Sequence, residues 1–241
     1  MKSLTYFLFL CLVFSSAANA AGSKADSSKA QPAVSSSQKK EAKKEQKKLS
    51  PAEVLSKLEA WDSKLNSLDI VFTQEVWFKE ADLKQTVEGN MQYLKPNFLR
   101  IEHTVPNKQI ITTDKKAIMI YKPDDKQAIN ATWDGWVKTK NQSFYGVLDF
   151  GNYSSLAKNN KYEVSGGENG IPYVISFTPK EGTQYELKIT LSPKDYFPSE
   201  AALTVGSAVT TTVLKKTEKN IKIDKAIFTQ ELPAKTDIIN F

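Results

Sequence analysis

The sequence lacks most of the residues that build reactive centres. Its 241 residues include one cysteine and one histidine. Cys11 lies in an apolar run near the N-terminus, so the rest of the chain has no thiol chemistry and no disulfide. His103 falls on an expected strand, where a packed or surface residue is commoner than a catalytic base, and metal sites need several converging ligands. With no Gly-rich phosphate loop and no nucleophile-elbow serine, we expect no enzyme activity and no cofactor.

Long apolar runs are also scarce. The only one, residues 4–14, follows Lys2 and precedes the small-x-small site Ala18-Asn19-Ala20. It is shorter than the roughly 20 residues that span a membrane. This layout is typical of a secretory signal peptide, here residues 1–20 with cleavage after Ala20. The bulky Leu10 before Cys11 disfavours lipidation, so we expect an exported, soluble protein.

The folded part has no excess charge of either sign. The net charge of +6 comes from Lys2 and from eight lysines against three acidic residues in 21–50, while residues 51–241 are neutral. Nucleic-acid binding needs clustered cations on a folded surface, so we expect none. Residues 21–49 are too polar to fold and are predicted to be a disordered linker. The linker is either a plain spacer or, through residues 39–48, a contact to anionic lipid headgroups.

Residues 50–241 make a single domain's length of chain, which opens with a helix. Ser50, Pro51 and Glu53 form a capping-box pattern, and an apolar stripe follows at helical spacing. The stripe consists of Val54, Leu55, Leu58, Trp61 and Leu65.

Alternation of apolar and polar residues then predicts antiparallel strands with one buried face. Strands are expected over 68–78, 86–94, 98–105, 108–113, 116–121, 127–133, 173–178, 185–191, 200–206, 209–217 and 222–230. The fold class is therefore mainly β (α+β), as one large curved sheet or a half-open antiparallel β-barrel of about eleven strands. The aromatic-rich segment 133–160 is expected to form two short helices, at Val147-Leu148 and at Ser154–Ala157. If the helices fill the sheet's concavity, it is an ordinary core; if they only cap it, a ligand cavity remains.

Several segments carry a recognisable pattern. They are Phe72-Thr73-Gln74, the run from Gly89 through Lys95-Pro96-Asn97 to Ile101, Pro106–Ile110, Thr113-Asp114, Ile118–Pro123, and Ala226–Thr229 with Pro233. Together these segments resemble the LolA family of periplasmic lipoprotein carriers. The resemblance covers residues 50–241 and is most specific in 86–133.

The resemblance implies a periplasmic chaperone whose hydrophobic cavity, capped by short helices, holds acyl chains. It would bind lipoproteins released from the inner membrane and deliver them to the outer membrane, as a part of outer-membrane biogenesis. Its partners would be acylated lipoprotein cargo, a LolCDE-like ABC lipoprotein-releasing transporter and a LolB-like outer-membrane acceptor. We expect a monomer.

In the family, an arginine just before the Pro-Asn pair latches the closed state by hydrogen bonding to the lid helices. Lys95 occupies that position here and is the lid-latch candidate, although an ammonium lacks the fixed fork of a guanidinium. Arg100, the only arginine, is predicted to be a solvent-facing strand residue. The residues expected to line the cavity are Ile70, Phe72, Val76, Met91, Tyr93, Leu99, Ile101, Ile118, Ile120, Tyr173, Ile175, Phe177, Leu187 and Ile189.

Two other functions stay open at this level. One is a periplasmic binding protein for another lipid or glycolipid, or the membrane-anchored acceptor of the same pathway. The other is a small enzyme on the same fold, for which the sequence offers no polar constellation.

Overall fold

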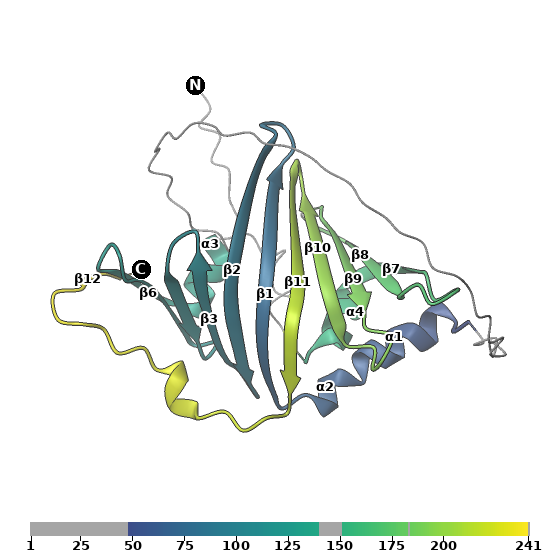
Figure 1. The fold of residues 1–241 in the computed structure, drawn as a ribbon, viewed down its shortest axis with the longest axis horizontal. Coiled ribbons are helices and arrows are strands. Elements are labelled where there is room, and N and C mark those ends of the chain that lie inside the picture. The colour runs from purple at the N-terminus through teal and green to yellow at the C-terminus, as the bar shows by residue number, and fades with distance from the viewer. Residues whose placement is uncertain (1–47, 140–150, 183, 241) are drawn as a thin grey trace, which may run out of the picture.

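The protein is built on one large sheet with most of its short helices on one face (Figure 1). The computed structural model describes residues 48–139, 151–182 and 184–240. The described strands form a twelve-stranded sheet in the order β12-β6-β5-β4-β3-β2-β1-β11-β10-β9-β8-β7. The sheet is open and unclosed, with β12 and β7 at its edges, and this confirms the predicted mainly β fold. The predicted signal peptide, nearly all of the linker and the helix at Val147-Leu148 lie outside the described residues.

The strands alternate in direction except at one edge, where β12 runs parallel to β6. Their bounds are β1 Ser67–Phe78, β2 Leu83–Leu94, β3 Phe98–Val105, β4 Gln109–Thr113, β5 Ala117–Lys122, β6 Gln127–Thr132, β7 Asn160–Ser165, β8 Val174–Pro179, β9 Glu186–Leu191, β10 Pro198–Val205, β11 Ala208–Lys219 and β12 Asp237–Asn240.

The helices are short. They are α1 Pro51–Glu59, α2 Trp61–Lys64, α3 Trp133–Thr139, α4 Tyr153–Asn159 and the 3-10 helix η2 Lys225–Phe228. The predicted capping box is confirmed, since the Ser50 hydroxyl accepts from the Glu53 N–H and the Glu53 carboxylate accepts from the Ser50 N–H. The expected single helix is interrupted at Ala60, and α2 begins at Trp61. The helix expected at Ser154–Ala157 is confirmed as part of α4.

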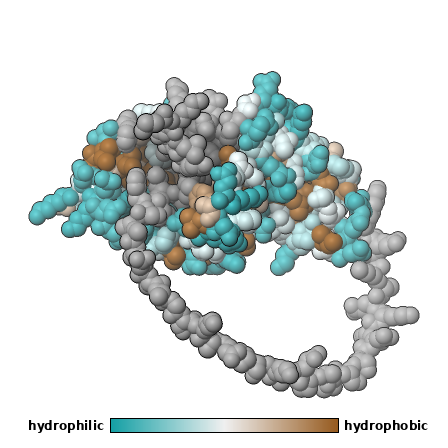
Figure 2. All heavy atoms as spheres, turned by 90° about the horizontal axis from the view of Figure 1, so that it is seen from above, coloured by the Kyte–Doolittle hydropathy of each residue, from teal (hydrophilic) through white to brown (hydrophobic). Residues whose placement is uncertain are grey.

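One face of the sheet, called the inner face below, packs against α1 to α4 in two apolar clusters. The first cluster joins β1 to β6 with Leu65 and Phe197, and Trp133 and Trp136 of α3 pack against it. The second joins β8 to β10 with α1 and α4, through residues such as Leu58. Trp61 packs against both clusters. Seen from above, the hydrophobic side chains of the described residues form small separate patches among hydrophilic ones (Figure 2).

Gly89 is required by the pairing of β2 with β3. The register shifts between Glu88 and Gly89, which is the irregularity of a β-bulge and bends a strand. A β-carbon at this position would collide with the main-chain oxygen of Glu102 and would lie 3.1 Å from the Phe72 ring. The glycine thus allows two strands and an inner-face aromatic ring to approach closely.

The main further differences from the sequence-based expectation concern one expected strand and both edges of the sheet. The strand expected over 222–230 is wrong, because that segment leaves the sheet and forms η2. The edge strands β7 and β12 were not predicted, and the strand expected to reach residue 133 ends at Thr132, where α3 follows. Edge strands pair on one side only and are partly exposed. The alternation of apolar and polar residues along them is therefore weaker and harder to detect in the sequence.

The segment that leaves β11 crosses the outer face of the sheet and ends in β12 (Figure 1). Arg100 of β3 holds it in place, because its guanidinium donates to the main-chain oxygen of Ile227 at 3.3 Å and to the side chain of Gln230 at 3.2 Å. The Arg100 side chain is only 18% exposed. The prediction that Arg100 faces solvent is therefore wrong, since a segment distant in sequence covers it.

Candidate functional site

The structure brings all fourteen predicted lining residues to the inner face of the sheet. Nine lie in the first cluster, namely Ile70, Phe72, Val76, Met91, Tyr93, Leu99, Ile101, Ile118 and Ile120. Four lie in the second cluster, namely Ile175, Phe177, Leu187 and Ile189, and the half-buried Tyr173 packs against it. Contact of these residues with a ligand stays a prediction.

Cross-strand register explains why these residues share a face. Ile70 pairs with Met91, Met91 with Ile101, Ile101 with Ile111, and Ile111 with Ile120. Residues that pair directly in a sheet point to the same side, so five strands contribute one continuous apolar row. Full burial of each such side chain contributes about 1.5–3 kcal/mol. The row gives the inner face an apolar surface with few directional bonds.

A polar strip along β11 separates the two clusters. Pairing with β1 puts mostly polar residues on the inner side of β11, namely Thr210, Thr212, Thr217 and Lys219, together with Leu214, which packs against the first cluster. Thr212 accepts a hydrogen bond from the Gln74 amide at 2.9 Å, so the glutamine that interrupts the apolar pattern of β1 is satisfied there. The inner face therefore consists of two apolar areas on either side of a threonine-rich strand.

The lid-latch candidate Lys95 contacts a helix. Lys95 lies in the turn between β2 and β3, and its ammonium donates to the main-chain oxygen of Asp62 in α2 at 3.0 Å. Its main-chain N–H donates to the main-chain oxygen of Asn66 at 2.8 Å, just beyond the same helix. Both groups on the helix side are main-chain oxygens, so the contact needs a donor at position 95 but no special partner side chain. The latch role itself stays a prediction.

Asp62 extends this contact to a second helix. Its carboxylate accepts the N–H of Tyr153 at 2.5 Å and the N–H of Ser154 at 2.9 Å, which are the first residues of α4. Unpaired N–H groups begin every helix, and a carboxylate there also complements the helix dipole. Burial, together with the nearby Asp62 charge, raises the pKa of Tyr153 well above its usual value. Lys95, Asp62, Tyr153 and Ser154 are called the rim contact below.

A second group of contacts holds α2 on its other side. The Lys219 ammonium lies 2.9 Å from the Asp195 carboxylate, 4.8 Å from the Phe197 ring and 5.5 Å from the Trp61 ring. The indole N–H of Trp61 donates to the main-chain oxygen of Asp195 at 3.2 Å. Burial opposes ionisation of Asp195, but hydrogen bonds from Lys219 and from the Phe197 N–H outweigh it and lower the pKa of this carboxyl. Cation–π contact and an ion pair thus combine at one end of the inner face.

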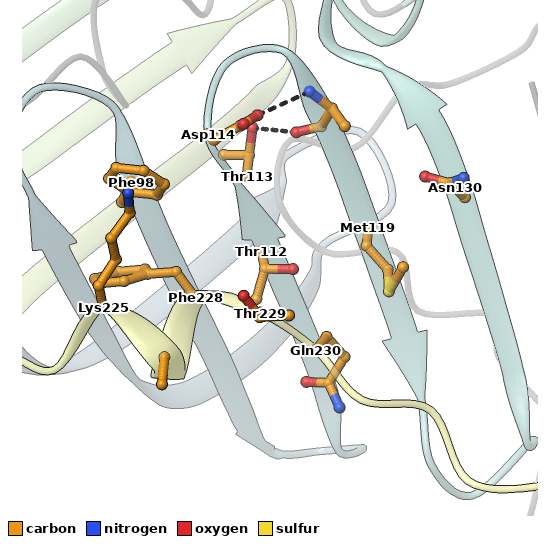
Figure 3. Close-up of a pocket in the computed structure, with 12 residues that line it drawn as sticks. Phe98, Thr112, Thr113, Asp114, Met119, Asn130, Lys225, Phe228, Thr229 and Gln230 are labelled. Carbon is orange, nitrogen blue, oxygen red and sulfur yellow. Dashed lines mark hydrogen bonds between the residues drawn. The ribbon is translucent and has the colours of Figure 1, made fainter.

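A groove of about 510 Å³ lies on the opposite, outer face (Figure 3). Its lining includes Phe98, Met119 and Phe228, and the Lys225 ammonium lies 4.5 Å from the Phe98 ring. The Asp114 carboxylate at one end accepts two main-chain N–H groups, which lower its pKa. None of the predicted lining residues borders this groove.

Within the described ranges, no group of three or more His, Cys, Asp or Glu residues is placed to hold a metal ion. None of the helices described is long and apolar enough to cross a membrane.

Residues 63–231 match the protein family described as "Outer membrane lipoprotein carrier protein LolA". The match extends over more than half of the chain, from α2 to just beyond η2. The chain belongs to the LolA family.

Individual relatives of this LolA-family chain carry the same description. A Neisseria meningitidis serogroup C protein named outer-membrane lipoprotein carrier protein is 28% identical over 156 residues, which cover 60% of this chain and 71% of the relative. A Yersinia enterocolitica protein of the same name is 32% identical over 82 residues, covering 34% of this chain and 40% of the relative. The crystal structure of an uncharacterized conserved protein from Thermus thermophilus superposes with a TM-score of 0.51 at 10% identity, covering 79% of this chain and 98% of that one. This structural likeness concerns the fold alone.

Sequence reasoning missed Asp62, Asp195 and Lys219. The sequence around each of them shows no unusual pattern. Each makes its contact with a residue that is far away in the chain or lies on a neighbouring strand. Tyr153 follows Asp62 by 91 residues. No local pattern identifies such pairs.

Proposed function

We propose that this protein is a periplasmic chaperone that holds the acyl chains of lipoproteins on the inner face of its sheet. It would accept lipoproteins released from the inner membrane and deliver them to the outer membrane. The observation that carries the proposal is the continuous apolar row across the inner face, covered by short helices that a few polar contacts hold at the rim.

Transfer energies explain why such a carrier is needed. Each buried methylene group contributes about 0.8 kcal/mol, so an acyl chain leaves a membrane for water only at a large cost in free energy. The apolar row offers non-directional contact, which binds a chain without fixing it. Opening then requires separation of the helices from the sheet. The rim contact is exposed enough to break, because Lys95 and the main-chain oxygen it meets lie at the surface.

The proposal includes export and partners. Residues 1–20 would act as a signal peptide cleaved after Ala20, residues 21–49 as a linker, and residues 50–241 as the carrier domain in the periplasm. A LolCDE-like transporter would supply the cargo, and a LolB-like acceptor would receive it. Carriage involves no covalent step, so the proposed role is binding and not catalysis.

Native mass spectrometry of the mature protein purified from periplasm tests the proposal. We expect a population whose extra mass corresponds to an acylated protein or acylated peptide. If the protein instead carries a glycolipid or another lipid, its function is that of a carrier for that lipid. A protein that emerges without any acylated species, also when the releasing transporter is co-expressed, would contradict the proposal.

We expect Lys95→Leu to impair cargo acceptance or release without unfolding the domain. The substitution removes the donor to Asp62 at an exposed site, where a hydrogen bond contributes only about 1 kcal/mol to stability. Transfer of an acylated peptide from the carrier to acceptor vesicles should therefore change several-fold while the thermal midpoint changes little. Lys95→Arg keeps a donor and should retain transfer.

Lys188→Leu is a matched control. It also removes an exposed contact, namely the ion pair between Lys188 and Glu186 at 3.1 Å, but on the outer face of the sheet. It should transfer cargo normally. Normal transfer by Lys95→Leu would remove Lys95 from the mechanism.

A further inference from the structure

The strand β7 is an open edge of the sheet (Figure 1). On one side it pairs with β8, in a register without a bulge from Asn160 to Ser165. On the other side no strand within residues 48–139, 151–182 and 184–240 pairs with it. An edge strand leaves a row of main-chain N–H and C=O groups unpaired, and these groups can pair with a strand of another chain.

Most of the features that prevent such pairing are missing from β7. Its six residues include no proline and no glycine. What remains is charge, because Lys161 and Glu163 are both exposed. Tyr162 and Val164 pack against the second cluster on the inner face, so the two charged residues that alternate with them point to the outer face. Charged residues on an edge normally keep other strands away, but these two are opposite in sign.

Neither of the two charged side chains has a partner among the described residues. The residues opposite them on β8 are Thr178 and Ser176, which are neutral. Elsewhere on the outer face, exposed charges do find partners within the chain, as in the ion pair of Lys84 with Glu75 at 3.1 Å. The two charges of β7 are therefore free to pair with a strand of opposite pattern.

A second copy of β7 has that opposite pattern when it runs antiparallel to the first. In a symmetric antiparallel pair, the residue on the twofold axis faces itself, and its two neighbours face each other across the axis. With Tyr162 on the axis, Lys161 of each copy faces Glu163 of the partner subunit. An axis through Lys161 or through Glu163 would oppose like charges, which destabilises a strand pair. Of these three registers, charge complementarity selects the one centred on Tyr162.

The same register suits the inner face. Tyr162 and Val164 are half-buried at the border of the second cluster. With Tyr162 on the axis, the two tyrosine rings are direct cross-strand neighbours, and aromatic pairs in this position stabilise a sheet. The opposite edge is less suitable, because β12 has four residues and a single charge, Asp237, so that no register of two β12 strands pairs opposite charges.

We propose that two copies of this protein pair through β7 in a symmetric dimer, with Tyr162 on the twofold axis and two ion pairs between Lys161 and Glu163 on the outer face. The two sheets then continue into each other, and the second cluster of one copy borders that of the other. The paired strands are short, so the dimer is weak and reversible. This state departs from the monomer expected from the sequence, and it does not depend on the carrier function.

Sedimentation velocity of the mature protein, residues 21–241, tests the dimer at concentrations from about 2 to 200 μM, the range of a weak complex. We expect the mass of one chain at the lowest concentration and of two chains at the highest. Lys161→Glu faces Glu163 of the partner subunit and should raise the dissociation constant at least about tenfold. Glu163→Lys should have the same effect. The double exchange of Lys161→Glu with Glu163→Lys restores both ion pairs and should restore the dimer.

Lys188→Glu is the matched control, since it makes the same change of charge at an exposed position on the outer face of β9, and it should leave the dissociation constant unchanged. Tyr162→Cys tests the register. Residues 21–241 contain no cysteine, so this variant should form a disulfide-linked dimer across the axis under oxidising conditions.

Three results would overturn the proposal. They are a single-chain mass at every concentration, a dimer that Lys161→Glu leaves intact, and a double exchange that fails to restore the dimer. Each of them leaves the carrier function untouched, because acyl-chain binding is measured separately by native mass spectrometry.

Discussion

Replacing Gly89 by valine should leave the protein largely unfolded. A β-carbon at this position meets the main-chain oxygen of Glu102 on the neighbouring strand, and a backbone atom inside a sheet has little room to move. The Phe72 ring closes the other side at 3.1 Å. Overpacking of a well-packed site costs about 1–3 kcal/mol, and occasionally more, for small groups. We expect about 3 kcal/mol for Gly89→Ala and more for Gly89→Val, a large part of the roughly 5–15 kcal/mol typical of a domain.

Urea unfolding followed by tryptophan fluorescence measures this loss. Gly182→Ala is the matched control, because Gly182 has a φ of +82° and nothing within 4 Å of an added β-carbon. The control should lose only about 1–2 kcal/mol, from backbone strain in the left-handed region. If Gly89→Ala is no less stable than Gly182→Ala, the close approach of β2 and β3 is not what requires a glycine.

Replacing Asp62 by alanine should release α4 from α2. The carboxylate holds the first two N–H groups of α4, and loss of a side-chain cap costs about 0.5–2 kcal/mol. The helix that loses its cap is α4, whose Tyr153 and Leu156 pack in the second apolar cluster. We expect hydrogen exchange of α4 to accelerate about tenfold, and a bound acyl probe to dissociate faster. Hydrogen–deuterium exchange read by mass spectrometry, with stopped-flow release of a fluorescent fatty acid, measures both effects.

Asp69→Ala is the control for the loss of a half-buried carboxylate. Asp69 lies on β1 and accepts a bond from Gln92 at 3.1 Å, away from the helices. It should leave both α4 exchange and probe release unchanged. Unchanged α4 exchange in Asp62→Ala would show that apolar packing alone holds the helix. Asp62→Asn keeps one acceptor oxygen and should give an intermediate result.

Much of the fold was predictable because its signals are local. Alternation along 98–105 predicted β3 with the bounds it has in the structure, and the Ser50 capping box predicted the start of α1. The same alternation placed all fourteen lining residues on one face. The edge strands β7 and β12 escaped prediction, because an edge strand is partly exposed and needs less of a pattern. The pattern of residues 222–230 predicted a strand, but its apolar residues help to form η2. Phe228 of η2 packs against Phe98, with 5.7 Å between the ring centres.

The candidate site was predictable only in part. Lys95 was identified through its place before Pro96-Asn97, but the oxygen it meets belongs to Asp62, 33 residues earlier. Arg100 was taken for a surface residue, because nothing in β3 shows that the C-terminal segment returns to cover it. His103 was expected to be a packed or surface residue of a strand, and the structure buries it; its unpaired Nε2 depends on the register that sets Gln109 opposite.

The sequence by itself determined the kind of surface this protein builds, since a period of two residues puts one chemical type on one face of a strand whatever the topology. It also limited the chemistry, through a single histidine and a single cysteine. Only the tertiary structure decided which polar groups meet. Contacts such as Asp62 with Tyr153, Lys219 with Asp195 and His103 with Gln109 depend on chain crossings and strand register, and these are set by the packing of the whole sheet.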